Sequence, residues 1–512
     1  MRRTISLGSA LLLLVALGPL APADAQTKED TIVYAIQSDV PNWDPPNSVL
    51  RESIILGYHV FDHLAARELK SGKVGPSLAT SWRALDDTTW EVKLRQGVKF
   101  HDGTPFTSKD VKASFDRVLD PEKKLTARGN HVKIKSVEVM DDHTVRFKTD
   151  GPYPVFVERL TALVIQSEKQ IKDKGHEYMQ ENPVGTGPYK LVRWNKKQEH
   201  LLVRNDDYWG SKPAFKHVLI RIIPEQATQI AELISGGVDI IKAVPPDQMD
   251  VINKSGQART STSPILRTAM LQLDQAGRSG KNPFQDKRVR QAANMAPDMD
   301  GIIKHVLNGL GDRVATTVNP MAFGFDPTLK PYKQDHAAAK KLLADAGYPN
   351  GFEVGFMTTG PTVEPGLIQT TEAIAADLAK VGIRTKQRFI GEVGPFTNLV
   401  RDNKADPMFT WSWGYYSIFD ADAILFDVMT CNQPYSYYCN KQLDDLVIQG
   451  RSTLDAKKRQ EIYAKAQKLV YDDAAYVFKW GLRGVWGISN RIEYEAPRDE
   501  IDRMFLVQPR KK

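Results

Sequence analysis

The sequence predicts a mixed α/β fold assembled from about three folding units. The chain has 512 residues, which exceeds one compact domain because domains commonly hold ~100–150 residues. Apolar residues make up 41% and charged residues 26% of the chain, which is typical of folded soluble proteins and unlike disordered, collagen-like or multispan membrane chains. Stretches with strand periodicity alternate with stretches of helical periodicity, and this alternation favours a sheet covered by helices.

The first half of the chain predicts strands that lead into helices. Residues 31–37 and 90–100 alternate in hydrophobicity and are rich in β-branched or aromatic side chains, as strands are. Thr107 and Asp110 form a capping box at the start of the next helix, and Pro121 ends that helix. The same signals predict a hairpin over 189–194 and 200–204, a buried strand over 218–223 and a helix over 225–235.

The second half shows the same alternation of strand and helix signals. It has no fixed repeat period of the kind that indicates a solenoid or a propeller. Asp335 caps a helix that stops at Gly347, and a helix over 367–381 leads into a strand over 383–390. No Gly/Ser-rich or Pro-rich linker separates the two halves. We therefore expect ordered strands to cross between domains, as they do at a hinge.

Residues 1–25 have the composition of a secretory signal peptide. Arg2 and Arg3 precede the apolar run 11–17, and small residues surround Ala25. We expect cleavage after Ala25 and export of the remaining chain. The apolar run is shorter than the ~20 residues of a spanning helix, and the residue directly after the cleavage site is Gln26, not a cysteine that could carry a lipid.

Cys431 and Cys439 are the two cysteines of the chain. In an oxidising compartment they predict one disulfide bond, and a loop this short contributes ~2–3 kcal/mol. Two thiols make an incomplete zinc site, and the spacing is not that of a Cys-x-x-Cys redox pair.

The charge pattern and the motifs favour neither nucleic-acid binding nor catalysis. The net charge of +7 comes from basic residues in ones and twos, without the stripe that a phosphate backbone requires. His59 and His63 have the spacing of metal ligands, but Val60 replaces the glutamate of a zincin motif and no third ligand is evident. Hydrolase and phosphate-loop signatures are missing, so we expect no catalytic residue, no metal and no cofactor.

Several motifs in order along the chain resemble one known family. They are residues 78–82, 90–106, 110–114, 182–189, 205–210 and 284–292. Together they resemble the dipeptide/oligopeptide/nickel family of extracytoplasmic solute-binding proteins (family 5), which serve ABC importers. The resemblance covers nearly all of the chain after the signal peptide.

The resemblance implies the two-lobe periplasmic-binding-protein fold (type II-like), with an extra subdomain inserted in the N-terminal lobe. The implied boundaries are 27–60, 183–265 and 485–512 for lobe I, 61–182 for the inserted subdomain, and 266–484 for lobe II. The two crossings between the lobes would lie near 267–274 and 477–483.

The resemblance also implies a function: the periplasmic solute-binding component of an ABC uptake transporter. Such a monomer captures a peptide-like or other small organic solute between two closing lobes and delivers it to a permease that is powered by an ATPase subunit. A secreted hydrolase, or a periplasmic chaperone or receptor on the same fold, stays open as an alternative.

The family also suggests which residues contact the solute. Its peptide-binding branch carries a Trp followed by an Asp that binds the ammonium group of the ligand, and Tyr416 stands here where that Asp would fall. Asp420 or Asp422 could replace it, while the aromatic residues favour stacking on the solute. The candidates by analogy are Trp413, Tyr415, Tyr416, Asp420, Trp43, Tyr58, Thr358, Thr359 and Asp274.

Overall fold

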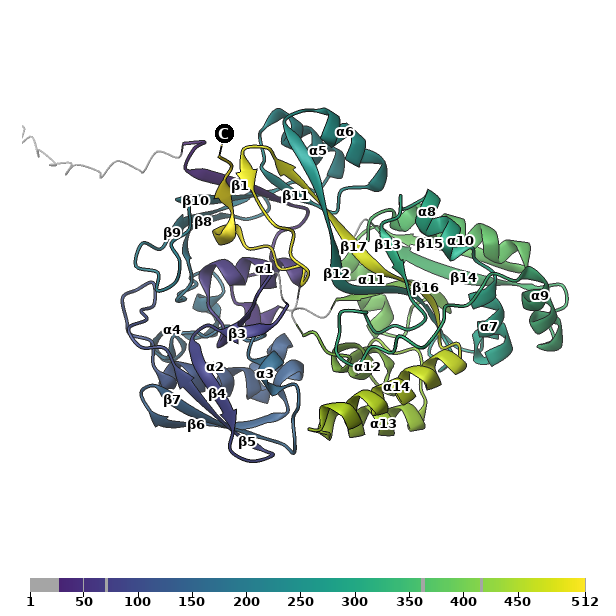
Figure 1. The fold of residues 1–512 in the computed structure, drawn as a ribbon, viewed down its shortest axis with the longest axis horizontal. Helices are drawn as coiled ribbons and strands as arrows, with labels where there is room; N and C mark the ends of the chain where they lie inside the picture. Colours follow the sequence, from purple (N-terminus) through teal and green to yellow (C-terminus); the bar gives the residue numbers. More distant parts are fainter. Residues whose placement is uncertain (1–26, 49, 70–71, 361–363, 415–417, 512) are drawn as a thin grey trace, which may run out of the picture.

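The computed structural model describes residues 27–48, 50–69, 72–360, 364–414 and 418–511. A mixed sheet of eleven strands runs through the molecule in the order β15-β14-β16-β12-β17-β11-β1-β10-β9-β8, with β13 beside β17. Helices cover it on both sides (Figure 1). The α/β class predicted from alternating strand and helix signals is confirmed. Across the described ranges, no helix is both long enough and apolar enough to cross a bilayer.

One end of the large sheet is built from the N-terminal strand and its neighbours. Strand β1 (Thr31–Ile36) pairs in parallel with β10 (His217–Ile222) and with β11 (Ile240–Lys242). The hairpin of β8 (Tyr189–Asn195) and β9 (Glu199–Arg204) extends this end, and α5 (Gln226–Ser235) follows β10. The predicted hairpin, buried strand and helix are all present.

Two long antiparallel strands join this end to the rest of the sheet. They are β12 (Ala258–Leu273) and β17 (Tyr476–Ser489). In Figure 1 they run from the part that carries β1 and β10 to the part that carries β14 and β16. Their register shifts between Pro264 and Thr268, and such an irregularity bends a strand.

The other end of the large sheet is formed by three parallel strands. They are β14 (Phe352–Thr359), β15 (Ile383–Ile390) and β16 (Met408–Gly414). The capped helix α9 (His336–Asp345) and the helix α10 (Leu367–Lys380) match the sequence prediction. The other helices of this end are α7 (Lys287–Met295), α8 (Met299–His305), α11 (Val393–Arg401), α12 (Asp422–Met429), α13 (Lys441–Ser452) and α14 (Ala456–Asp472).

A separate four-stranded sheet has the order β4-β5-β7-β6. Its strands are β4 (Ala79–Ala84), β5 (Thr89–Leu94), β6 (Ile134–Asp141) and β7 (Thr144–Thr149). The helix α2 (Ser108–Leu119) packs on it and begins with the predicted capping box of Thr107 and Asp110. The strand predicted over 90–100 is wrong in its second half, because the chain turns at Gly97, whose φ of 75° ends the extended conformation.

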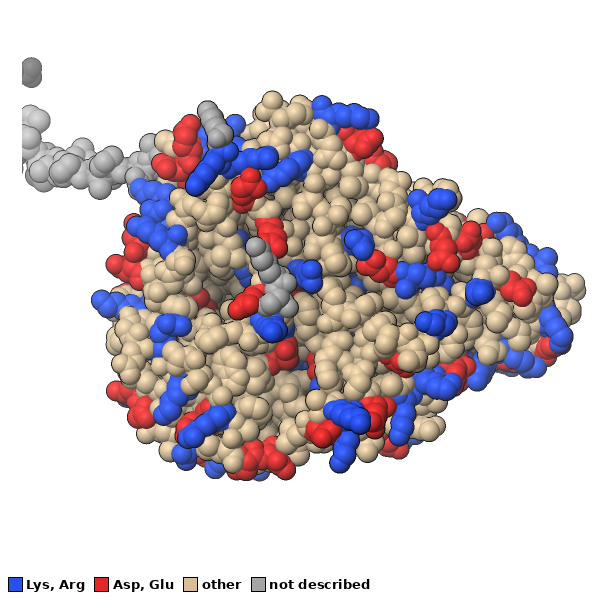
Figure 2. All heavy atoms as spheres, in the orientation of Figure 1, with Lys and Arg blue, Asp and Glu red and all other residues tan. Residues whose placement is uncertain are grey.

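The remaining elements are short. They are α1 (Arg51–Val60), α3 (Phe156–Arg159), α4 (Glu168–Met179), α6 (Met249–Lys254), β2 (Ala65–Arg67), β3 (Val74–Pro76), β13 (Gly311–Arg313), β18 (Ile492–Glu493) and β19 (Gln508–Pro509). Buried apolar side chains form three clusters, one of which belongs to the four-stranded sheet. Figure 2 shows basic and acidic side chains interspersed over the visible face, so no field of a single sign forms there.

Candidate functional site

The carboxyl ends of parallel strands from both ends of the large sheet meet near one residue, Glu500. Lys242 ends β11, and its Nζ donates to the carbonyl oxygen of Glu500 at 3.3 Å. Gly414 ends β16, and a Cβ built on it would lie 2.7 Å from the Glu500 Oε2. Ligands of open α/β sheets bind in the crevice outside the carboxyl ends of the strands. This junction is therefore the candidate site.

Glu500 connects three segments of the chain through buried ion pairs. The Arg267 Nε donates to both carboxylate oxygens at 3.0 and 3.1 Å, and the Arg51 Nη1 donates to Oε1 at 2.9 Å. Arg267 also reaches the carbonyl oxygen of Ser412 in β16 at 3.4 Å. Burial alone would raise the pKa of Glu500, but the two guanidinium groups hold this pKa below its ordinary value.

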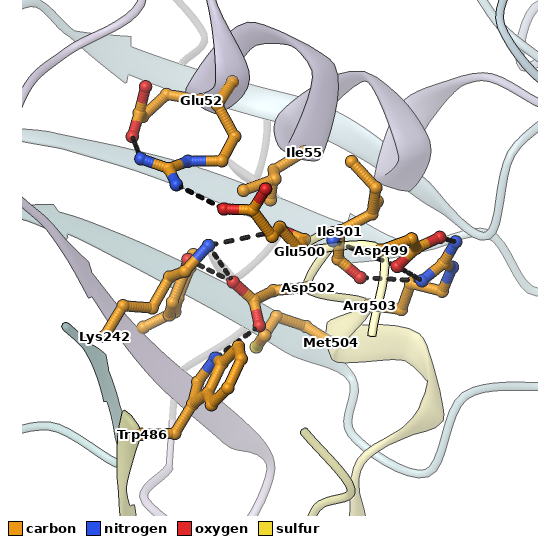
Figure 3. Close-up of polar contacts among 12 residues, drawn as sticks. Glu52, Ile55, Lys242, Trp486, Asp499, Glu500, Ile501, Asp502, Arg503 and Met504 are labelled. Carbon is orange, nitrogen blue, oxygen red and sulfur yellow. Dashed lines mark hydrogen bonds and ion pairs between the residues drawn. The ribbon is translucent and has the colours of Figure 1, made fainter. Parts of the chain in front are cut away.

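Asp502 lies two residues further and is fully buried. Its carboxylate contacts the Lys242 Nζ at 2.7 Å and accepts hydrogen bonds from Tyr34, Trp486 and Tyr494 at 2.9, 2.9 and 2.5 Å. Figure 3 shows Lys242 and Trp486 directed toward this carboxylate. Burial opposes ionisation, yet the Lys242 ammonium and these donors keep the pKa of Asp502 below its ordinary value. The C-terminal segment is therefore held firmly against the sheet.

A group of three aromatic side chains lies at the end of β16. The ring of Trp411 is 6.4 Å from that of Trp413 and 5.5 Å from that of Tyr435, and Trp413 is 6.0 Å from Tyr435. The indole Nε1 of Trp413 donates to the carbonyl oxygen of Ala423 at 2.6 Å, which fixes the orientation of the ring. Trp413 and Tyr435 are half-buried, so part of each ring is open for stacking.

The predicted disulfide between Cys431 and Cys439 is present and closes the loop that carries Tyr435. Gln272 of β12 donates to the carbonyl oxygen of Tyr435 at 3.1 Å. The Arg278 Nη1 donates to the carbonyl oxygens of Gln433 and Ser436 at 3.1 and 2.6 Å. Tyr435 is not among the site residues predicted from the sequence, although a tyrosine-rich loop closed by a disulfide is a usable signal.

The site residues predicted in the second half of the chain differ in where the structure places them. Thr358 and Thr359 end β14 at the same edge of the sheet as Gly414. The hydroxyls of Thr358 and Thr410 are 3.2 Å apart. The Thr359 Oγ1 and the Trp411 Nε1 are buried, and neither has a hydrogen-bond partner among the residues that the structure describes. Tyr415 and Tyr416 lie outside the described residues.

Asp420 is engaged by the protein itself. The Nη1 and Nη2 of Arg459 bind its two carboxylate oxygens at 2.6 and 2.7 Å, and both side chains are 5% exposed. The oxygens of Asp422 lie at ion-pair distances of 2.8 Å from the Arg451 Nε and 3.6 Å from the Arg159 Nη2, but neither oxygen accepts a hydrogen bond among the described residues. Both carboxylates therefore face arginines of the chain.

The three remaining candidates make contacts within the protein. The Trp43 Nε1 donates to the His200 Nδ1 at 3.2 Å, and the Tyr58 hydroxyl donates to the carbonyl oxygen of Thr161 at 2.9 Å. Asp274 accepts from the backbone N–H of Arg278 at 2.9 Å, and it thereby holds the turn whose arginine supports the disulfide loop. That these three residues contact the solute stays a prediction.

The histidine pair with metal-ligand spacing lies in and beside α1. The His59 Nε2 accepts from the backbone N–H of Met504 at 3.0 Å, and the His63 ring stacks on Tyr58 with centroids 4.1 Å apart. Burial lowers the pKa of His59 to about 4 and that of His63 to about 3. No group of three metal-ligating side chains exists within the part of the chain that the structure covers.

A second contact joins the four-stranded sheet region to the loop before α12. The Arg67 guanidinium lies 4.1 Å from the centre of the Phe419 ring. The backbone N–H of Phe419 donates to the Glu158 Oε2 at 3.3 Å. The ion pair of Arg159 and Asp422 bridges the same two regions. The large sheet is therefore not the only structural connection across the candidate site.

Two halves joined by crossing strands, with a polar and aromatic junction between them, define a two-lobe solute-binding protein. Residues 73–435 match the model for bacterial extracellular solute-binding proteins, family 5 Middle. This chain belongs to that family and is the solute-binding component of an ABC importer, acting with permease and ATPase subunits. The two-lobe fold expected from the motifs is confirmed, and the family to which the motifs pointed is the correct one.

Similar proteins cover nearly the whole chain. The Escherichia coli protein named "Probable D,D-dipeptide-binding periplasmic protein DdpA" is 29% identical over 498 residues, 93% of each chain. Heme-binding protein A of Haemophilus influenzae is 27% identical, again over 93% of each chain. The structure of the periplasmic binding protein DppA of Helicobacter pylori with the peptide STSA has a TM-score of 0.84 and 28% identity, and covers 94% of this chain and 98% of that one.

Proposed function

We propose that this importer component holds its solute by aromatic stacking and neutral hydrogen bonds, without an ion pair to an α-ammonium group. The observation that carries this proposal is the ion pairing of the described carboxylates at the junction. Glu158, Asp420, Asp422 and Glu500 each lie within ion-pair distance of an arginine of the chain. A carboxylate that already has an arginine partner offers little additional attraction to an ammonium group.

The neutral groups at the junction support the same proposal. Trp413 and Tyr435 present half-buried rings, and within the described ranges the Thr359 hydroxyl and the Trp411 indole N–H have no hydrogen-bond partner. A buried donor without a partner costs free energy, which a bound acceptor recovers. The solute that fits this chemistry is a small organic molecule or blocked peptide with a planar or apolar face and a hydrogen-bond acceptor.

The finer features of the protein are also proposals. We propose that the lobes divide where β12 and β17 cross, close to residues 265 and 485, and that the signal peptide is cleaved after Ala25. We infer that the chain catalyses no reaction, because the resemblance is to binding proteins throughout. A hydrolysis panel that contains peptides, esters and glycosides tests this inference, and turnover above the rate without protein would contradict it.

The solute itself can be identified from protein purified out of its native periplasm. Native mass spectrometry is expected to show one retained small molecule, and its addition to stripped protein is expected to raise the melting temperature. Met-Leu, a D,D-dipeptide, glutathione and hemin make a first panel, because related proteins carry such ligands in their names or structures. N-acetylation of any amine-bearing solute that binds is expected to leave its affinity within threefold. A loss of tenfold or more would show that an ammonium group is recognised.

Removing either aromatic ring is expected to weaken binding of the identified solute about tenfold, because stacking and the apolar area beneath it are lost. The variants are Trp413→Ala and Tyr435→Ala, measured by isothermal titration calorimetry. Tyr178→Ala is the matched control, since Tyr178 is 44% exposed on α4. If all three variants bind as the unsubstituted protein does, the solute lies elsewhere.

A further inference from the structure

The ion pairs of Glu500 lie between the two halves, beside the register shift of β12. Arg267 lies inside the register shift between Pro264 and Thr268, where β12 turns from the first half toward β16. Its backbone is paired with Gly414, the last residue of β16. Arg51 lies at the other side of the carboxylate, in the first turn of α1. Glu500 therefore touches a helix of the first half and the bent part of a crossing strand.

The end of β16 packs directly on this ion pair. A Cβ at position 414 would overlap the Arg267 guanidinium and lie 2.7 Å from the Glu500 Oε2. Only glycine leaves room for both groups there. The side chains of Arg51, Arg267 and Glu500 are 15%, 8% and 3% exposed, so water screens these charges weakly. The neighbouring backbone is also constrained, because Glu500 has a φ of +63°, which non-glycine residues rarely adopt.

We propose that Glu500 is a positioning residue that sets the angle between the two lobes. It does so by bridging Arg51 and Arg267 against the end of β16. This inference rests on the proposed division into two lobes at β12 and β17, and it adds the group that holds them together. A buried carboxylate shared by two guanidinium groups is costly to open, because both ion pairs with Glu500 would be lost in a dry environment.

The same segment contains a matched control. Asp499, the preceding residue, is 3% exposed and pairs with Arg503 at 2.7 Å. Figure 3 shows that Asp499 and Arg503 face each other within the C-terminal segment. Asp499→Asn therefore disturbs an ion pair of similar burial whose partner, Arg503, lies in the same segment, whereas Glu500→Gln weakens the connection between the halves.

Lobe separation can be measured without any solute by double electron–electron resonance. Spin labels are placed at Val192→Cys in β8 and Ile448→Cys in α13, which are 57% and 56% exposed and lie in different halves. The two native cysteines are joined to each other, so they take no label. Glu500→Gln is expected to move the main distance peak to a longer separation, and Asp499→Asn is expected to leave it in place.

Gly414→Ala is a second variant that tests the same proposal without changing any charged group. Its methyl group is expected to displace the Arg267 guanidinium and to lengthen the same distance, so it decides the question if Glu500→Gln does not fold. Unchanged distances in Gly414→Ala and in any folded Glu500→Gln would overturn the proposal, as would an equal shift in Asp499→Asn. The rise in melting temperature with solute is measured on the unsubstituted protein, so failure of solute capture is told apart from failure of this inference.

Discussion

Asp420→Ala is expected to lower the free energy of unfolding by about 3–5 kcal/mol, because it leaves the buried Arg459 guanidinium without its carboxylate. The two side chains form paired hydrogen bonds of 2.6 and 2.7 Å. Arg459 also donates to the carbonyl oxygen of Gly450 and to the Tyr463 hydroxyl, both at 2.9 Å. These contacts hold the guanidinium in place, so it cannot turn toward solvent. Urea denaturation followed by far-ultraviolet circular dichroism measures the loss.

Asp472→Ala is the control, because Asp472 makes an exposed ion pair with Lys468 at 2.8 Å, and such pairs contribute ~1 kcal/mol or less. The resemblance offered Asp420 as a replacement for the missing amine-binding carboxylate. If that role is correct, Asp420→Ala weakens solute affinity while the free energy of unfolding stays within ~1 kcal/mol of that of Asp472→Ala. That pattern would contradict the structural role.

Acidification from pH 7 to pH 5 is expected to destabilise the protein strongly through its buried histidines. Burial lowers the pKa of His131 to about 3, and the Arg159 charge adds to this effect. His59, His63 and His101 are lowered to about 4, 3 and 4. The unfolded chain binds a proton near pH 6.5, whereas the folded chain excludes it until the pH approaches the lowered pKa. Stability is therefore lost progressively as the pH falls below about 6.5.

His131→Leu isolates one of these contributions. His131 is 1% exposed and packs edge-on against Phe115 with centroids 5.9 Å apart. Neither ring nitrogen has a hydrogen-bond partner in the described part of the chain. The variant is expected to lose about 2 kcal/mol less than the unsubstituted protein between pH 7 and pH 5. Urea denaturation at both pH values measures the difference, with the exposed His305→Leu as the control. Equal losses in all three proteins would contradict the assignment.

Local signals predicted much of the fold. The capping box of Thr107 and Asp110 involves residues three positions apart, and the disulfide joins cysteines eight positions apart. The helix capped by Asp335 and the strand over 383–390 were likewise predicted from their own residues. In each case the interacting groups are close in the chain, so composition and spacing carry the information.

The candidate site was predicted less completely. The family resemblance drew attention to the strand that ends at Gly414 and to the two threonines of β14, which share one edge of the sheet. It could not reveal that Asp420 is bound by Arg459, 39 positions later. Tyr435 was missed because its proximity to Trp413 depends on how the disulfide loop packs on β12.

The order of residues alone established the α/β class, the local helices and strands, the disulfide and the family of solute-binding proteins. Tertiary structure decided which charged side chains are already paired within the protein and which are open to a solute. Glu500 pairs with Arg51, which lies 449 positions earlier, and with Arg267, which lies 233 positions earlier. The free energy of such a pair depends on burial and on distances of a few ångströms. Residues so far apart in the chain become buried and come within a few ångströms of each other only when the chain has folded.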